Sequence, residues 1–241
     1  MTGPAPVFEG RNGFFNVVSR QPFEIGPFGG RGHPFRILKS HLKQFPICNG
    51  GQTVVPAALE ARKLVADLRN IAEIHIHVSQ NAWNVMADSA DKWRPRNRET
   101  ADHSIPFTTA VALKYGTVDG RYFADNYLND EELLALTSRI KCSVSEEANR
   151  RVEEINLCDF DLTLRSGERK SIRVEYHRGH YMNPMADSDI ENKVRLLVGD
   201  MLPGPRIDAL ISQLWGLDSL ADAGTLIQMT LRERTAAGRA A

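Results

Sequence analysis

The sequence predicts a mixed α/β fold of the α+β type with flanking helices. Segments 71–78, 154–164 and 170–176 alternate apolar and polar residues, as half-buried strands do. Amphipathic stretches with helical spacing separate and follow these segments. The chain has 241 residues, which is enough to bury a hydrophobic core. Strands interleaved with helices therefore predict a sheet covered by helices.

Composition argues against several classes of protein. The chain has 30 basic and 30 acidic residues, so no overall field favours nucleic acid or a membrane surface. No apolar run approaches the roughly 18 residues of a membrane span, and the first ten residues do not resemble a signal peptide. Three cysteines without paired spacing favour neither a disulfide framework nor a zinc site. We therefore expect a cytoplasmic protein.

The chain is expected to have three regions. Residues 1–34 form an irregular lead-in segment, because glycine and proline interrupt every pattern in its second half. Residues 35–190 carry the α/β patterns, and residues 191–241 are C-terminal helices. The apolar face of the last helices needs a partner to bury it. That face comprises Ile207, Leu210, Ile211, Leu214 and Trp215.

A predicted strand, turn and helix begin the α/β region. Residues 35–45 alternate as a strand, a glycine-rich turn follows, and residues 54–68 are amphipathic. Lys43 at the strand end and Gln52 at the helix start place an ammonium and an amide together, which suits a carboxylate or phosphate. In the alternative interpretation the glycines only shape the turn and Lys43 is solvated. Cys48 is expected to be a small buried residue.

The segment KWRPRNRETADHSIPFTTAVALKY, residues 92–115, combines the most varied chemistry. Arg94, Arg96 and Arg98 lead to a polar cluster, and an apolar helix begins at Ile105. Free N–H groups at a helix start favour anions, and the arginines strengthen that preference. We therefore expect this helix start to bind an anionic group.

Three residues at that helix start are candidates for chemistry. Asp102 or Ser104 can cap the helix, with Pro106 in its first turn. His103 is a candidate acid or base. The alternative is that Asp102 only caps and His103 is a hydrogen-bonded structural residue.

Two histidines alternate on the strand at residues 71–78. His75 and His77 share one face and are spaced to chelate a metal. No carboxylate or cysteine is suitably spaced with them in the sequence, so the favoured interpretation is a polar sheet face without metal.

Further elements complete the prediction. Residues 81–88 are a short helix, and residues 130–140 form another with acidic residues in its first turn. Residues 165–168 join two strands as a hairpin. Asn183-Pro184 turns the chain into a closing helix.

Four segments, in family order from about Phe8 to about Leu197, resemble the MmgE/PrpD family, which includes 2-methylcitrate dehydratase, decarboxylases of cis-aconitate and epimerases of iminodisuccinate. FEGRNGFFNVV resembles the start of the family's second half. LKQFPICNGGQT resembles its Lys-x-aromatic-Pro turn with the following Gln-Thr. KWRPRNRETADHSIPF resembles its Glu-Thr-Ala-Asp-His-Ser-x-Pro block, and NPMADSDIENKVRLL resembles its Asn-Pro-Met turn.

The resemblance implies an α/β lid domain that docks on an all-helical partner. Family members have an all-helical first half carrying much of the catalytic site, and this chain resembles only the lid with its return helices. We expect the partner to be a separate subunit in a homo- or hetero-oligomer. The chain also departs from the family, which commonly carries a histidine in the turn where this sequence has Cys48-Asn49-Gly50-Gly51.

The implied function is that of a subunit of a split, cofactor-independent lyase or isomerase. It resembles 2-methylcitrate dehydratase and would remove an α-proton from a small polycarboxylate. Two alternatives stay open: a non-catalytic regulatory subunit that stabilises a full-length paralogue, and a truncated product without function. By this resemblance, the catalytic candidates are Lys43, His103 and Asp102, and the substrate-binding candidates are Gln52, Ser104 and Arg98.

Overall fold

The computed structural model describes residues 6–24 and 26–231, which belong to two compact units, 1–40 and 41–241. The described part of the first unit contains a π-helix at Phe15–Ser19 and a 3-10 helix at Arg36–Lys39. Phenylalanine rings pack edge to face around the π-helix, with the Phe15 and Phe23 centroids 5.1 Å apart. The strand predicted at 35–45 is wrong, because alternation alone does not supply a neighbouring strand to pair with.

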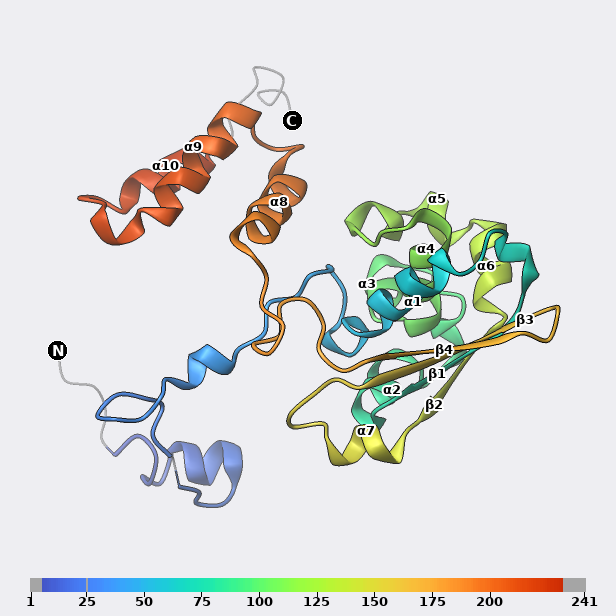
Figure 1. Cartoon of the computed structure of the whole chain (residues 1–241). Coiled ribbons are helices and arrows are strands. Elements are labelled where there is room, and N and C mark those ends of the chain that lie inside the picture. The colour runs from blue at the N-terminus through green and yellow to red at the C-terminus, as the bar shows by residue number, and fades with distance from the viewer. Residues whose placement is uncertain (1–5, 25, 232–241) are drawn as a thin grey trace, which may run out of the picture. The chain divides into compact units, whose positions relative to one another are not determined.

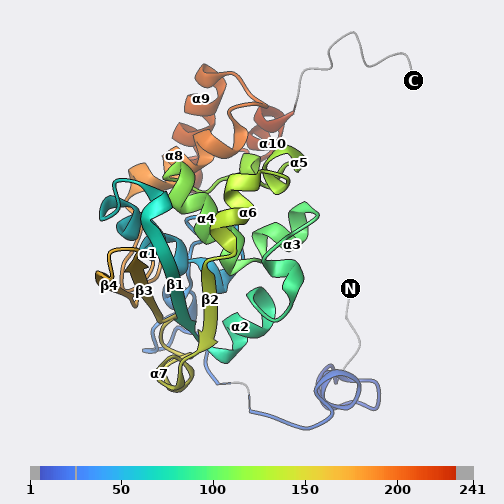
Figure 2. The same ribbon diagram turned by 90° about the vertical axis from the view of Figure 1, so that its right-hand side faces the viewer.

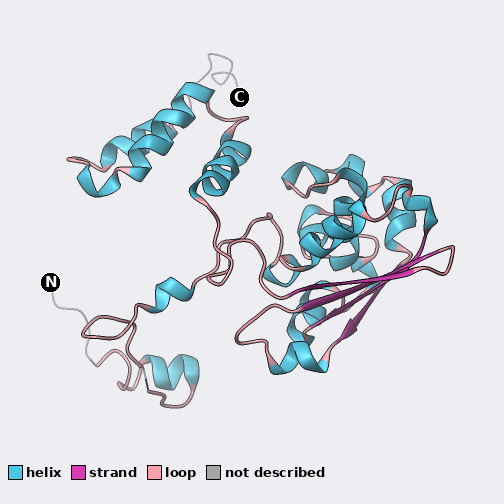
Figure 3. Cartoon of the chain, viewed as in Figure 1, coloured by secondary structure: helices cyan, strands magenta, loops and turns pink. Residues whose placement is uncertain are grey.

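The second unit is built on a four-stranded sheet in the order β2-β1-β3-β4, which Figure 2 shows. Figure 3 shows the strands of this sheet in magenta. Strand β1 (Ile71–Val78) pairs in parallel with β2 (Ile140–Val144) and antiparallel with β3 (Cys158–Leu164). Strand β3 forms the predicted hairpin with β4 (Arg169–Val174). The mixed α/β prediction is thus confirmed.

Strand β2 is the element that the sequence interpretation missed. The helix expected over residues 130–140 is α6, which ends at Thr137, and β2 begins at Ile140. Only five residues long and at the sheet edge, β2 carries too short an alternation to be distinguished from a helix end.

The core lies on one side of the sheet. In Figure 1, α1 (Val54–Lys63) and α4 (Ile105–Tyr115) lie over that side. Every α4 residue from Ile105 to Leu113 is buried, as expected of a helix that is apolar almost all round. Ser104 caps this helix and Pro106 lies in its first turn, as predicted. Gly116 ends it with a φ of 73°, a left-handed conformation that glycine adopts without strain.

The C-terminal helices are α8 (Asp187–Val198), α9 (Gly204–Trp215) and α10 (Gly224–Thr230). Ile207, Leu210 and Ile211 are buried in a small cluster among these helices. The expectation that their whole apolar face needs an outside partner is therefore corrected, because the helices cover three of its five residues themselves. Leu214 and Trp215 remain exposed. Residues 232–241 of the predicted tail lie outside the described residues.

Short helices connect the remaining elements, and no helix in the described ranges is long and apolar enough to cross a membrane. The remaining α-helices are α2 (Gln80–Met86), α3 (Arg98–Asp102), α5 (Asp125–Leu128), α6 (Glu131–Thr137) and α7 (Glu146–Arg150).

Candidate active site

Residues 43–51 form a turn just before helix α1, which we call the Lys43 turn. Gln52 holds this turn in place. The side-chain oxygen of Gln52 accepts hydrogen bonds from the backbone N–H groups of Gln44 and Phe45, at 3.0 and 3.2 Å. Its side-chain nitrogen donates to the carbonyls of Phe45 and Ile47, at 2.9 and 3.3 Å. Gln52 is fully buried. These four bonds use the whole capacity of the amide, so Gln52 positions the turn rather than contacting a ligand.

Lys43 itself is exposed on this turn. Its backbone carbonyl accepts a hydrogen bond from the ammonium of Lys193 on α8. Because Gln52 fixes the backbone immediately after Lys43, the start of this side chain is held while its charged end remains accessible.

Asp102 and His103 form a hydrogen-bonded pair at the end of α3. His103 Nδ1 lies 2.5 Å from Asp102 Oδ1 and 3.0 Å from the carbonyl of Glu99. Two oxygen acceptors around Nδ1 favour the tautomer that carries its proton there. Nε2 has no hydrogen-bond partner in the described part of the chain, and the His103 side chain is 34% exposed. In this tautomer Nε2 is the nitrogen without a proton, and such a nitrogen on a partly exposed side chain has the form that a general base requires.

Ser104 has a structural place in this site. Its hydroxyl donates to the carbonyl of Lys92 and accepts from the backbone N–H of Phe107 at 3.0 Å. The residue is fully buried. Ser104 thus closes the start of α4, and its hydroxyl has no accessible surface for substrate.

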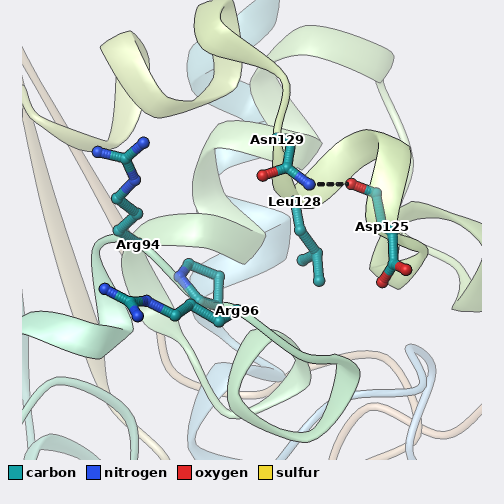
Figure 4. Close-up of a pocket in the computed structure, with 6 residues that line it drawn as sticks. Arg94, Arg96, Asp125, Leu128 and Asn129 are labelled. Atoms are coloured by element: carbon teal, nitrogen blue, oxygen red, sulfur yellow. Dashed lines mark hydrogen bonds between the residues drawn. The ribbon is translucent and has the colours of Figure 1, made fainter.

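The arginines before α3 are exposed, and none of them forms an ion pair within the described ranges. Arg94 and Arg96 line a pocket of about 390 Å³ together with Asp125, Leu128 and Asn129. Figure 4 shows the two guanidinium groups on one side of this pocket and Asp125 with Asn129 on the other. Arg98 does not line the pocket.

A backbone hydrogen bond brings the Lys43 turn and the Asp102–His103 pair together. The N–H of Cys48, in the turn, donates to the carbonyl of Asp102 at 3.1 Å. The backbone at Cys48 therefore lies against the end of α3, which is more than fifty positions later in the sequence. Whether Lys43 and His103 share a single cleft stays a prediction.

One group of residues near this pair has spacing compatible with a metal ion. Among the described residues, Glu99, Asp102 and His103 offer ligand atoms within 4.8 Å of one another. The Glu99 side chain is 85% exposed, and the Nδ1 of His103 is engaged by Asp102. Acid–base chemistry at Nε2 leaves these contacts in place, whereas a metal would have to replace them.

The face of the sheet opposite the core carries His75 and His77. Ser143 Oγ is 2.9 Å from His77 Nδ1, and Asp161 Oδ2 is 3.3 Å from His77 Nε2. No carboxylate is suitably spaced with these histidines in the sequence, and the nearby Asp161 comes from another strand, because β3 brings it across from β1. Both nitrogens of His77 therefore have partners, and the polar sheet face is confirmed.

A cluster of three histidines was not anticipated. His41, His177 and His180 come together, with the ring centroids of His41 and His180 4.2 Å apart. His177 is 1% exposed, and neither of its ring nitrogens has a hydrogen-bond partner among the described residues. Burial, with the nearby charges of His41 and His180, lowers the pKa of His177 to about 4. The motif HRGH is the signal that the sequence offered.

Comparison of the sequence with known protein families shows which family the chain belongs to. The model of the MmgE/PrpD C-terminal domain matches residues 45–217, which include the end of the Lys43 turn, the Asp102–His103 pair and helix α8. The chain belongs to the MmgE/PrpD family. The recognition made from the sequence motifs is thereby confirmed.

Two curated relatives of this chain are cis-aconitate decarboxylases. The human protein is 25% identical over 187 residues, covering 77% of this chain and 38% of the relative. The mouse protein is 22% identical over 135 residues, covering 56% of this chain and 28% of the relative. The matched region thus spans well under half the length of either relative.

Proposed function

We propose that this chain is the lid subunit of a cofactor-independent lyase or isomerase that acts on a small polycarboxylate. The observation that carries the proposal is the Asp102–His103 pair, with its accessible Nε2, beside the Lys43 turn. An all-helical MmgE/PrpD-type subunit completes the site. Family membership and the similarity to cis-aconitate decarboxylases support this reaction class.

The proposed reaction begins with removal of a proton α to a carboxylate. Nε2 of His103 takes the proton, and the C–H electron pair moves into the neighbouring carboxylate as an enolate-like charge. The Lys43 ammonium stabilises that charge, and Asp102 stabilises the imidazolium that forms. The imidazolium of His103 then gives its proton to the β-hydroxyl, which leaves as water as the double bond forms and completes a dehydration. In an epimerisation, a second acid, supplied by the helical subunit, protonates the opposite face of the carbon.

In a decarboxylation at the same site, the negative charge on carbon comes from the carbon–carboxylate bond instead of from a C–H bond. The carbon–carboxylate bond breaks, carbon dioxide leaves, and the electron pair remains on the carbon chain. Lys43 again stabilises the developing charge, and His103, which starts this reaction as the imidazolium, donates a proton to carbon. Dehydration of 2-methylcitrate and decarboxylation of cis-aconitate thus use Lys43 in the same way, but the first needs His103 neutral and the second needs it protonated.

Exposed apolar side chains support the partner in this proposal. On and beside the C-terminal helices, Leu196, Leu197, Leu214, Trp215 and Ile227 are between 44% and 65% exposed. Large apolar residues gathered on one group of helices mark an interaction surface. An all-helical subunit offers the complementary apolar faces for helix packing.

One observation favours the alternative of a non-catalytic regulatory subunit. Cys48, Asn49, Gly50 and Gly51 occupy the turn where family enzymes commonly carry a histidine. A lid that lacks this group would still dock on a full-length paralogue. The two functions differ in whether the assembly needs His103 for turnover.

Co-expression with an all-helical subunit tests the proposal. The chain alone and the complex are purified and assayed with 2-methylcitrate, citrate and cis-aconitate. We expect turnover only in the complex, and we expect His103→Ala to remove it while His77→Ala, a histidine on the far face of the sheet, leaves it intact. Turnover by a monomer of this chain alone contradicts the need for a partner. Turnover that survives His103→Ala contradicts the catalytic role.

A further inference from the structure

Lys193 has a defined position on helix α8. The start of this helix is fixed by Asp189, whose Oδ2 accepts from the backbone N–H of Ala186 at 2.8 Å and lies 2.6 Å from Arg178 Nη2. Lys193 follows Asp189 by one helical turn, so the two side chains share one face. The ion pair with Arg178 therefore orients the face of α8 from which Lys193 projects.

The segment that includes Arg178 also holds the Lys43 turn. The backbone N–H of Leu42 donates to the carbonyl of Gly179 at 2.8 Å. Gly179 has a φ of 102°, and a Cβ at this position would lie 2.1 Å from the Leu42 carbonyl oxygen. Only glycine permits this close approach. One short segment thus connects both lysines.

The side chain of Lys193 reaches the backbone of Lys43. The Lys193 ammonium donates to the backbone carbonyl of Lys43, and neither ammonium forms a salt bridge with an acidic side chain in the parts of the chain that the structure describes. Burial and the positive charge of Lys43 lower the pKa of Lys193. An anion that contacts both ammonium groups would offset the repulsion between them.

We propose that Lys43 and Lys193 together form a carboxylate-binding site, in which Lys193 is a second cationic anchor for the substrate. This inference rests on the proposed function for the choice of a carboxylate over another anion. A polycarboxylate has several carboxylates, so each of the two ammonium groups can hold one of them. This assignment leaves the Asp102–His103 pair free for the proton transfer.

Lysine labelling tests the site without any substitution and in any oligomeric state. The full chain is treated with an amine-reactive acylating reagent, with and without tricarballylate, a tricarboxylate that has no hydroxyl to eliminate. Peptide mapping then measures the labelling rate at each lysine. We expect tricarballylate to slow labelling of Lys43 and Lys193 and to leave Lys63, exposed on α1 and paired with Glu60, unchanged. Equal rates at Lys193 with and without the ligand overturn the proposal.

Substitutions give a second, independent readout. Lys193→Met should weaken tricarballylate binding about tenfold, the effect of losing one charge-assisted hydrogen bond. Lys193→Arg should retain most of the affinity because the charge remains, and Lys63→Met serves as the control. Thermal unfolding of each variant shows whether the fold is preserved. Binding that is unaffected in a folded Lys193→Met variant overturns the proposal.

The two proposals fail in different ways. If tricarballylate protects Lys193 but the complex turns over no carboxylic acid, the proposed function fails and the carboxylate site stands. If the complex is active while Lys193→Met changes neither KM nor tricarballylate binding, the carboxylate site fails and the proposed function stands. The labelling experiment needs no activity, so its outcome is read independently.

Discussion

The His103 region and the His77 region both place a histidine beside a carboxylate, yet only one is equipped for acid–base chemistry. Exposure does not distinguish them, because the His103 and His77 side chains are 34% and 27% exposed. Their partners do. His77 has Ser143 on Nδ1 and Asp161 near Nε2, whereas His103 has its oxygen partners on Nδ1 alone. The comparison shows that the nitrogen left without a partner, rather than the neighbouring acid, is what makes His103 the candidate base.

The largest effect should separate these two histidines in the proposed complex with a helical subunit. His103→Ala removes the proposed base and should lower kcat by about a hundredfold or more. His77→Ala should change kcat less than twofold, since His77 lies across the sheet from the core. Steady-state kinetics on both purified complexes, with circular dichroism to confirm folding, provide the test. Equal losses of kcat in the two variants would contradict a catalytic role that belongs to His103 and not to His77.

The Gln52 amide should show the next largest effect, this time on stability. Gln52→Ala leaves buried backbone groups of the Lys43 turn without partners and should lower the free energy of unfolding by about 2–4 kcal/mol. Ser143→Ala, which removes one hydrogen bond on the polar sheet face, should cost less than about 1 kcal/mol. Urea unfolding measures both values. A Gln52→Ala variant as stable as Ser143→Ala would show that the amide does not hold the turn.

A third histidine, His177, should make the stability of the fold depend on pH. The folded-state pKa of His177, about 4, lies below its ordinary value of 6.5, so the unfolded chain binds a proton first as the pH falls. The stability associated with neutral His177 is present above about pH 6.5 and is lost between that pH and about 4. Between pH 7 and 5 the free energy of unfolding should fall about 1–2 kcal/mol more in the native protein than in His177→Phe. Equal pH dependence would assign the acid sensitivity elsewhere.

The smallest predicted effect concerns the cap of α4. Ser104→Ala removes the side chain that accepts from Phe107 N–H, and it should cost about 1 kcal/mol of stability. Ser104→Asp keeps an acceptor at the cap but loses the donor to Lys92, so it tests which of the two bonds matters. If both variants are as stable as the native protein, the cap contributes nothing measurable.

Local sequence signals accounted for much of the fold and for half of the site. Alternation identified β1 and the β3–β4 hairpin, and the Ser104-Ile105-Pro106 start of α4 was recognisable from its capping residues. The strand expected at 35–45 failed because pairing partners are not encoded locally. Asp161 beside His77 depends on strand register, which no single segment contains.

The candidate site likewise has features that one motif predicts and features that depend on long-range contacts. The Asp102–His103 pair involves consecutive residues, so its chemistry was visible in one motif. The role of Gln52 was not, because its four bonds reach back to the turn that precedes it. Lys193 lies 150 positions from Lys43, and only the connection through Gly179 brings the two together. The sequence therefore did not predict the long-range contacts of the site.

Hydrogen exchange at the substrate carbon tests the central claim most directly. The complex with the helical subunit is incubated with 2-methylcitrate or cis-aconitate in D₂O, and proton NMR follows replacement of substrate hydrogen together with product formation. Native protein and His77→Ala should incorporate deuterium at matching rates, while His103→Gln, which keeps a polar side chain but no base, should incorporate none above background. Incorporation by His103→Gln at the native rate would contradict the assignment of His103 as the group that moves the proton.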